Sequence, residues 1–191
     1  MTVGPDRIAW LARLVSTLLH PFAVLMALVL LVLWWQRTPD MAPLLAGLAL
    51  VIGVAWVFVL QRRHAGHWTT VDASRKRDRP ELYVVLLALL GGYWWWLQGR
   101  DAPHAGGVLA VGAMFLAAAM LNRWIKLSLH MACLAFAGIA LLQVLPVAAF
   151  VAGALLPLLG WARLRMARHA MPEVLGGTLL GVVTGAALQL P

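Results

Sequence analysis

Long apolar runs separated by short polar segments dominate the sequence. A membrane-spanning helix needs roughly 20 mostly apolar residues, with a range of about 17–25. Seven runs come close to that length, at about 20–36, 42–60, 82–98, 107–122, 128–144, 146–162 and 173–190. Pro146 separates the fifth run from the sixth, because the residue before a proline is pushed away from helical geometry. The pattern predicts an all-α, polytopic transmembrane bundle of six or seven spans.

The segment before the first run has a different, amphipathic pattern. Ile8, Leu11, Val15 and Leu18 share one face of a predicted helix. Such a helix can lie in the plane of the membrane interface. We therefore expect one membrane domain over residues 1–191, with an interfacial segment at 1–19 and a transmembrane bundle over 20–190.

Composition and charge support this class of protein. Hydrophobic residues make up 63% of the chain and charged residues 12%, whereas soluble domains average roughly 45–50% and 25%. The formal net charge is +8, but the bases lie in short segments between apolar runs. Membrane orientation and anionic lipid headgroups explain them better than nucleic acid does. We expect membrane lipids, and no nucleic acid, as partners.

The side of the membrane follows from the same basic residues. Seven crossings would place thirteen of the fifteen lysines and arginines on the N-terminal side. The positive-inside rule then makes that side cytoplasmic. Within the last predicted span, Gly177, Gly181 and Gly185 form a stripe of small residues. We expect this stripe to pack against another helix of the same chain rather than to form a dimer.

Three polar segments, at 72–80, 126–130 and 162–173, interrupt the apolar pattern. Two predicted crossings separate the first from the second, and two more separate the second from the third. All three segments therefore reach the same face of the predicted bundle and can form one site.

The third segment has the residue types of a reactive histidine. Glu173 follows His169 by four residues and would share its helical face, unless Pro172 interrupts the helix. A carboxylate bonded to one imidazole nitrogen fixes the tautomer and raises the basicity of the other. His130 offers a second imidazole for proton transfer, and arginines offer forked donors to phosphate oxygens. Taken singly, each residue fits an ordinary role as a topology anchor or a solvated side chain. Together on one face they favour phosphoryl transfer through a phosphohistidine.

These segments resemble the signatures of a known enzyme family. The stretch Ala162-Arg163-x5-His169-x3-Glu173 resembles the last signature, SRx5HxxxD, of the type 2 phosphatidic acid phosphatases. The stretch Ser128-Leu129-His130 resembles the PSGH motif of that family, and Arg79-Pro80 resembles the end of its KxxxxxxRP motif. The resemblance covers about residues 72–177.

The resemblance implies an activity and a set of roles. It implies a metal-independent and cofactor-independent phosphatase of the bacterial inner membrane, acting on a lipid or prenyl phosphate. His169 would be the nucleophile, Glu173 would hold it, and His130 would protonate the leaving oxygen. The residues implied to bind the substrate phosphate are Arg79, Arg163 and Ser128, with Arg75 or Lys76 in place of a missing lysine.

Several positions depart from the family pattern. Asp72 stands where the family has its lysine, Leu127 and Leu129 replace a proline and a glycine, and Ala162 replaces a serine. These changes leave two alternatives open, a phosphotransferase that uses the same intermediate and a non-catalytic lipid-binding protein. A small transporter is disfavoured, because coupled transporters place charged groups near the midplane and no acidic residue lies in the middle of a predicted span.

Overall fold

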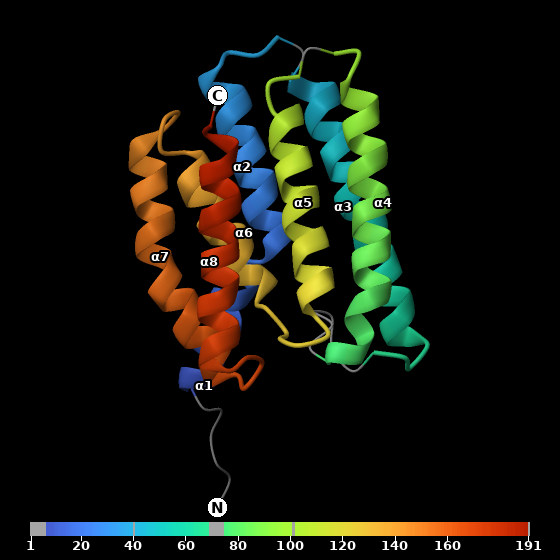
Figure 1. Cartoon of the computed structure of the whole chain (residues 1–191), viewed down its shortest axis with the longest axis vertical. Helices are drawn as coiled ribbons and strands as arrows, with labels where there is room; N and C mark the ends of the chain where they lie inside the picture. The colour runs from blue at the N-terminus through green and yellow to red at the C-terminus, as the bar shows by residue number, and fades with distance from the viewer. Residues whose placement is uncertain (1–6, 40, 69–74, 101, 191) are drawn as a thin grey trace, which may run out of the picture. The chain divides into compact units, whose positions relative to one another are not determined.

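The computed structural model describes residues 7–39, 41–68, 75–100 and 102–190 (Figure 1). These residues form eight α-helices and one 3-10 turn, and no strand is present among them. The elements are α1 (Arg7–Leu18), α2 (Pro21–Trp35), α3 (Met41–His64), η1 (Lys76–Asp78), α4 (Arg79–Leu97), α5 (Ala105–Leu121), α6 (Leu129–Ala140), α7 (Pro146–Arg165) and α8 (Met171–Leu188). The predicted all-α class is confirmed for this part of the chain.

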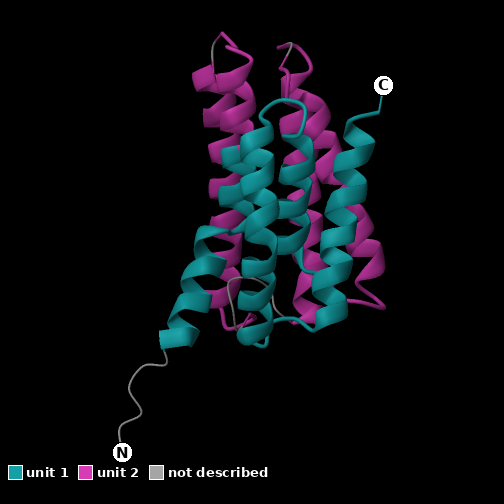
Figure 2. Cartoon of the chain, turned by 90° about the vertical axis from the view of Figure 1, so that its left-hand side faces the viewer, with its two compact units in different colours: residues 1–27, 127–191 teal, residues 28–126 magenta. Residues whose placement is uncertain are grey.

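The helices belong to two compact units, shown in different colours in Figure 2. Unit 1 comprises Met1–Ala27 and Leu127–Pro191, and unit 2 comprises Leu28–Lys126. Unit 1 therefore consists of an N-terminal and a C-terminal part of the chain. Helix α2 begins in unit 1 and ends in unit 2. The second polar segment belongs to unit 1 from Leu127 onward, and the third segment belongs to it entirely.

In unit 1, α6 is the central helix. It packs against α8 and α7, and α1 packs against α7. Ten of its twelve residues are buried, including Cys133 and Phe136. A helix that is apolar on all sides is normally enclosed by other elements, and α6 fits this rule.

The glycine stripe of α8 allows this helix to approach α6 closely. A Cβ atom on Gly177 would collide with the carbonyl oxygen of Ser128, and one on Gly181 would collide with that of Ala132. A Cβ on Gly185 would lie 2.7 Å from Cβ of Ile139. Small residues permit this kind of backbone approach between membrane helices. The prediction that the stripe packs within the chain is confirmed.

In unit 2, α4 packs against α3 and α5. The hydroxyl of Tyr93 donates a hydrogen bond to the carbonyl oxygen of Leu44 at 2.8 Å and lies 2.8 Å from Nε2 of His104. Because the Tyr93 hydroxyl proton is donated to Leu44, the Nε2–H of neutral His104 donates to the Tyr93 hydroxyl oxygen. This buried link ties α3 and α4 to the start of α5.

The expectation of six or seven membrane spans is not confirmed. Among the described residues, four helical segments are long and apolar enough to cross a membrane, and the pair α1 and α2, bent by 44°, makes a fifth if it is counted as one span. Helix α5 has 17 residues and α6 has 12. At 1.5 Å per residue α6 extends only about 18 Å, against a hydrocarbon core of about 30 Å. The predicted run at 128–144 is shortened because the helix ends at Ala140 and the chain turns before Pro146.

Helix α1 presents a different face to the protein from the apolar face seen in the sequence. Ile8, Leu11 and Leu18 are exposed, whereas Ala12 and Ser16 are buried. The small residues face α7 because they permit a close approach. The large apolar side chains point outward, as an interfacial helix requires.

Candidate functional site

In unit 1, the start of α6, the end of α7 and the start of α8 lie at the same end of the unit (Figure 1), and these helix ends carry polar residues. Each of Ser128, His130, Arg163 and His169 is at most 7% exposed. The backbone N–H of Ser128 donates to the carbonyl oxygen of Glu173 at 3.0 Å and so joins the start of α6 to the start of α8. The second and third predicted segments therefore meet. These five residues are called the unit 1 cluster below.

His169 and Glu173 form the closest polar pair of the cluster. Nδ1 of His169 lies 2.8 Å from Oε2 of Glu173, and the two side chains are 1% and 20% exposed. The condition for a shared helical face, an uninterrupted helix from His169 to Glu173, is not met. His169 precedes α8, and Ala170 at the N-cap is extended, with φ −88° and ψ 162°. Pro172 falls in the first turn, where its fixed φ and missing N–H are tolerated.

The pair forms because Glu173 reaches back over the start of its helix. Oε2 of Glu173 also accepts the backbone N–H of Ala170 at 3.2 Å. This is the carboxylate half of a capping box. A carboxylate only accepts hydrogen bonds, so Nδ1 of His169 is the donor and neutral His169 carries its lone pair on Nε2.

The turn between α7 and α8 carries His169 back toward the cluster. Ala167 has a φ of 51°, in the left-handed region. Its N–H donates to the carbonyl oxygen of Leu164, and the N–H of Arg168 donates to that of Arg163. Such bonds close the end of a helix in the way that a glycine usually permits. An alanine in this conformation costs roughly 1–2 kcal/mol.

Ser128 and His130 stand at the N-terminal end of α6. Ser128 is the N-cap residue, and its Oγ makes no hydrogen bond to any residue that the structure describes, although it is fully buried. Buried hydroxyls normally have a partner. The positive end of a helix dipole and a free hydroxyl together suit an anion.

Two residues that sequence reasoning did not assign to the site lie next to the cluster. Nη1 of Arg163 donates to Oγ of Ser16 on α1 at 2.9 Å. The ring of His20 lies edge to face against that of His130, with 5.2 Å between centroids. In the sequence, His20 is marked only as the first residue of the apolar run at 20–36. The sequence around Ser16 does not indicate a role in the site, because its partner Arg163 is 147 positions away.

The remaining predicted phosphate ligands belong to unit 2. Arg79 is buried as the first residue of α4, whereas Lys76 and Arg75 are exposed. Arg75 and Arg79 are four positions apart but do not share a helical face, because Arg75 is extended and precedes η1. Nζ of Lys76 donates to the carbonyl oxygen of Arg123 at 2.6 Å. Asp72 lies outside the described residues. That these bases join the unit 1 cluster stays a prediction.

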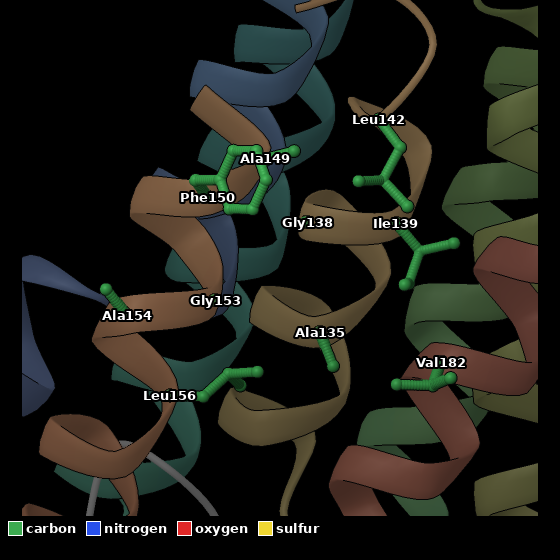
Figure 3. A pocket seen from close by; sticks show the side chains of 10 residues that line it. All are labelled: Ala135, Gly138, Ile139, Leu142, Ala149, Phe150, Gly153, Ala154, Leu156 and Val182. Carbon is green, nitrogen blue, oxygen red and sulfur yellow. The ribbon is translucent and has the colours of Figure 1, made fainter. Parts of the chain in front are cut away.

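An apolar cavity of about 440 Å³ lies between α6, α7 and α8 (Figure 3). Its walls include Ala135 and Gly138 of α6, Phe150 and Gly153 of α7, and Val182 of α8. The small residues leave space between the helices. The cavity therefore offers room for a hydrocarbon chain, and it is built from the same three helices as the unit 1 cluster.

Comparisons with protein-family models, curated proteins and solved structures gave no match for this chain. The case for a function depends on the geometry of the unit 1 cluster and on the motifs that the sequence carries.

Proposed function

We propose that this chain is an integral membrane phosphatase that hydrolyses a phosphomonoester or diphosphate of a lipid or prenol through a phosphohistidine on His169. The observation that carries the proposal is the 2.8 Å contact between Nδ1 of His169 and Oε2 of Glu173. It leaves Nε2 as the nucleophilic nitrogen. When Nε2 is phosphorylated the ring becomes cationic, and the adjacent carboxylate stabilises that charge.

In the first step, the lone pair of Nε2 attacks phosphorus. The N–P bond forms as the bond from phosphorus to the lipid oxygen breaks, and protonated His130 gives its proton to the leaving oxygen. In the second step, water attacks phosphorus and the N–P bond breaks. The water proton passes to His130, which is then an acid again, and inorganic phosphate leaves. His130 thus acts as a general acid and then as a general base.

The phosphate oxygens need fixed donors during both steps. Arg163 supplies a guanidinium fork, and Ser128 supplies its buried hydroxyl at the positive end of α6. Arg79, with Arg75 or Lys76, is proposed to add further positive charge. No metal or cofactor takes part in these steps.

The apolar cavity and the apolar helices support the proposal that the substrate is a lipid. We propose that the hydrocarbon chain enters the cavity between α6, α7 and α8. We also propose a multi-pass protein of the plasma membrane, in bacteria the inner membrane, with its N-terminus and site on the cytoplasmic side. The thirteen basic residues on the predicted N-terminal side support that orientation.

Sidedness is tested with single cysteines in intact cells and a membrane-impermeant maleimide. Cys133 is buried, so the introduced thiol is the one that reacts. His67→Cys should remain unlabelled until the membrane is opened, and Arg100→Cys should be labelled directly. The reverse pattern would place the site on the outer face.

The activity is tested by phosphate release from the purified full-length chain in detergent micelles. Phosphatidic acid, phosphatidylglycerol phosphate and polyprenyl phosphates should be offered in turn. Release should be lost in His169→Ala and His130→Ala, and it should persist in His67→Ala, whose side chain is exposed in unit 2. Transfer of phosphate to an added alcohol in preference to water would identify a phosphotransferase. Lipid binding without any turnover would identify a non-catalytic protein.

A further inference from the structure

The packing of α1 on α7 brings a buried serine to the end of α7. Ser16 is 6% exposed and Arg163 is 2% exposed, and the Nη1–Oγ distance is 2.9 Å. A guanidinium has five N–H donors in a rigid plane. One N–H fixed on Ser16 therefore sets the plane of the whole fork. The adjacent residue on α7 is Ala162, which has no hydroxyl to do this.

Ser16 can also contact a ligand. A serine hydroxyl has one proton and two lone pairs. By accepting from Arg163, Ser16 keeps its own proton for an acceptor such as a phosphate oxygen. A small apolar residue would fill the same space against α7 without either bond.

His20, in the bend between α1 and α2, lies against His130. The two rings meet at an interplanar angle of 81° with 5.2 Å between centroids. His20 also precedes α2 as a cap, because its Nδ1 accepts the backbone N–H of Phe22 at 3.3 Å. His20 is thus held by the start of α2, and its ring limits the orientations that the His130 ring can take.

We infer that the segment from Ser16 to His20 contributes to the phosphate site. Ser16 positions Arg163, and His20 positions His130. The inference rests on the proposed function and adds to it a contribution from the amphipathic N-terminal helix. A helix lying along the membrane surface then has a second role, because its buried face holds a phosphate ligand in place.

The Ser16 part is tested on the full-length chain in detergent, with inorganic phosphate as the probe and lipid phosphate turnover measured beside it. Ser16→Ala should weaken phosphate binding and raise KM by about tenfold, with kcat little changed. Ser16→Thr keeps the hydroxyl and should restore both values. Thr17→Ala, an exposed neighbour on α1, is the matched control. Equal phosphate affinity in Ser16→Ala and Thr17→Ala would overturn this part.

The His20 part is tested with two variants that separate the ring contact with His130 from the cap bond to Phe22. His20→Phe keeps an aromatic ring against His130 and loses the cap, whereas His20→Asn keeps a cap acceptor and loses the ring. We expect kcat to fall by about tenfold in His20→Asn, with a changed pH profile, and to be largely retained in His20→Phe. The opposite order would show that His20 serves only as a cap.

Failure of the inference and failure of the proposed function give different results. If the wild type binds inorganic phosphate through Ser16 but releases none from any lipid, the phosphatase proposal fails and the positioning of Arg163 stands. If the wild type turns over lipid phosphate and Ser16→Ala matches Thr17→Ala, the phosphatase proposal stands and the role of Ser16 fails. A wild type that does not bind phosphate overturns the role of Ser16.

Discussion

Glu173 holds His169 from within the first turn of α8, although His169 itself lies before that helix. The contact of 2.8 Å and the second bond to the N–H of Ala170 use one carboxylate oxygen to fix both the imidazole and the start of the helix. The orientation of the His169 ring is thus tied to the position at which α8 begins. A change at Glu173 should affect catalysis more than its partial exposure would suggest.

Glu173→Gln should lower kcat by about 100- to 10,000-fold, because an amide neither fixes the Nδ1–H tautomer nor stabilises a cationic phosphoimidazole. The measurement is steady-state phosphate release from a lipid phosphate. Glu81→Gln is a suitable control, since Glu81 is an exposed carboxylate of unit 2. Full activity in Glu173→Gln would contradict the role given to this residue.

Gly177→Ala should destabilise unit 1 by about 1–3 kcal/mol, because the added methyl group collides with the carbonyl oxygen of Ser128. It should also lower activity, since Ser128 and His130 begin the same helix. Thermal unfolding in detergent measures the first effect. Gly112→Ala on α5 meets no atom within 4 Å, so its stability should be unchanged or raised by up to ~1 kcal/mol. Equal stability in the two variants would argue against close packing of α8 on α6.

Gly153→Leu should test whether the apolar cavity takes the hydrocarbon chain. A Cβ at this position meets nothing within 4 Å, and the residue lines the cavity. The larger side chain should therefore fill space without a clash. We expect KM for a long-chain lipid phosphate to rise by about tenfold, equivalent to burying about one or two fewer methylene groups. Turnover of a short, water-soluble phosphate ester should be unchanged. Equal effects on both substrates would contradict the assignment.

The stability of unit 2 should depend on pH through His104. Burial lowers the pKa of His104 below 6.5, so the unfolded chain takes up a proton at a higher pH than the folded chain. The contribution of the neutral ring is therefore complete above about pH 6.5 and declines as the pH falls toward the lowered pKa. Thermal unfolding measured from pH 7.5 to pH 5 should show this loss in the wild type. The loss should be smaller in His104→Gln and unchanged in His67→Gln. Identical pH dependence in all three chains would refute this prediction.

The sequence predicted those features that depend on local pattern. All seven apolar runs contain a helix, Pro146 begins α7, and the glycine stripe packs inside the chain. The spacing of four residues also related His169 to Glu173, although the two side chains do not meet on one helical face. The carboxylate reaches back across a helix start, and a proline in the first turn supports that start.

Features that depend on distant contacts were not predicted. The length of α6 was overestimated, because apolar residues continue through its terminal turn and give no sign of where the helix ends. The sequence predicted the apolar face of α1 but not its buried face, since hydrophobicity does not distinguish contact with lipid from contact with protein in a membrane chain. Ser16 and His20 were missed because their partners lie on α7 and α6, more than 100 positions away along the chain.

Trapping of the covalent intermediate tests the central claim most directly. The full-length chain is mixed with a lipid phosphate labelled in its phosphoryl group and quenched in alkali, which preserves phosphohistidine, and the labelled peptide is then identified by mass spectrometry. We predict one phosphoryl group on His169, absent in His169→Ala and accumulating in variants that slow attack by water. Turnover of the lipid with no label on His169, or with label on another residue, would contradict the mechanism.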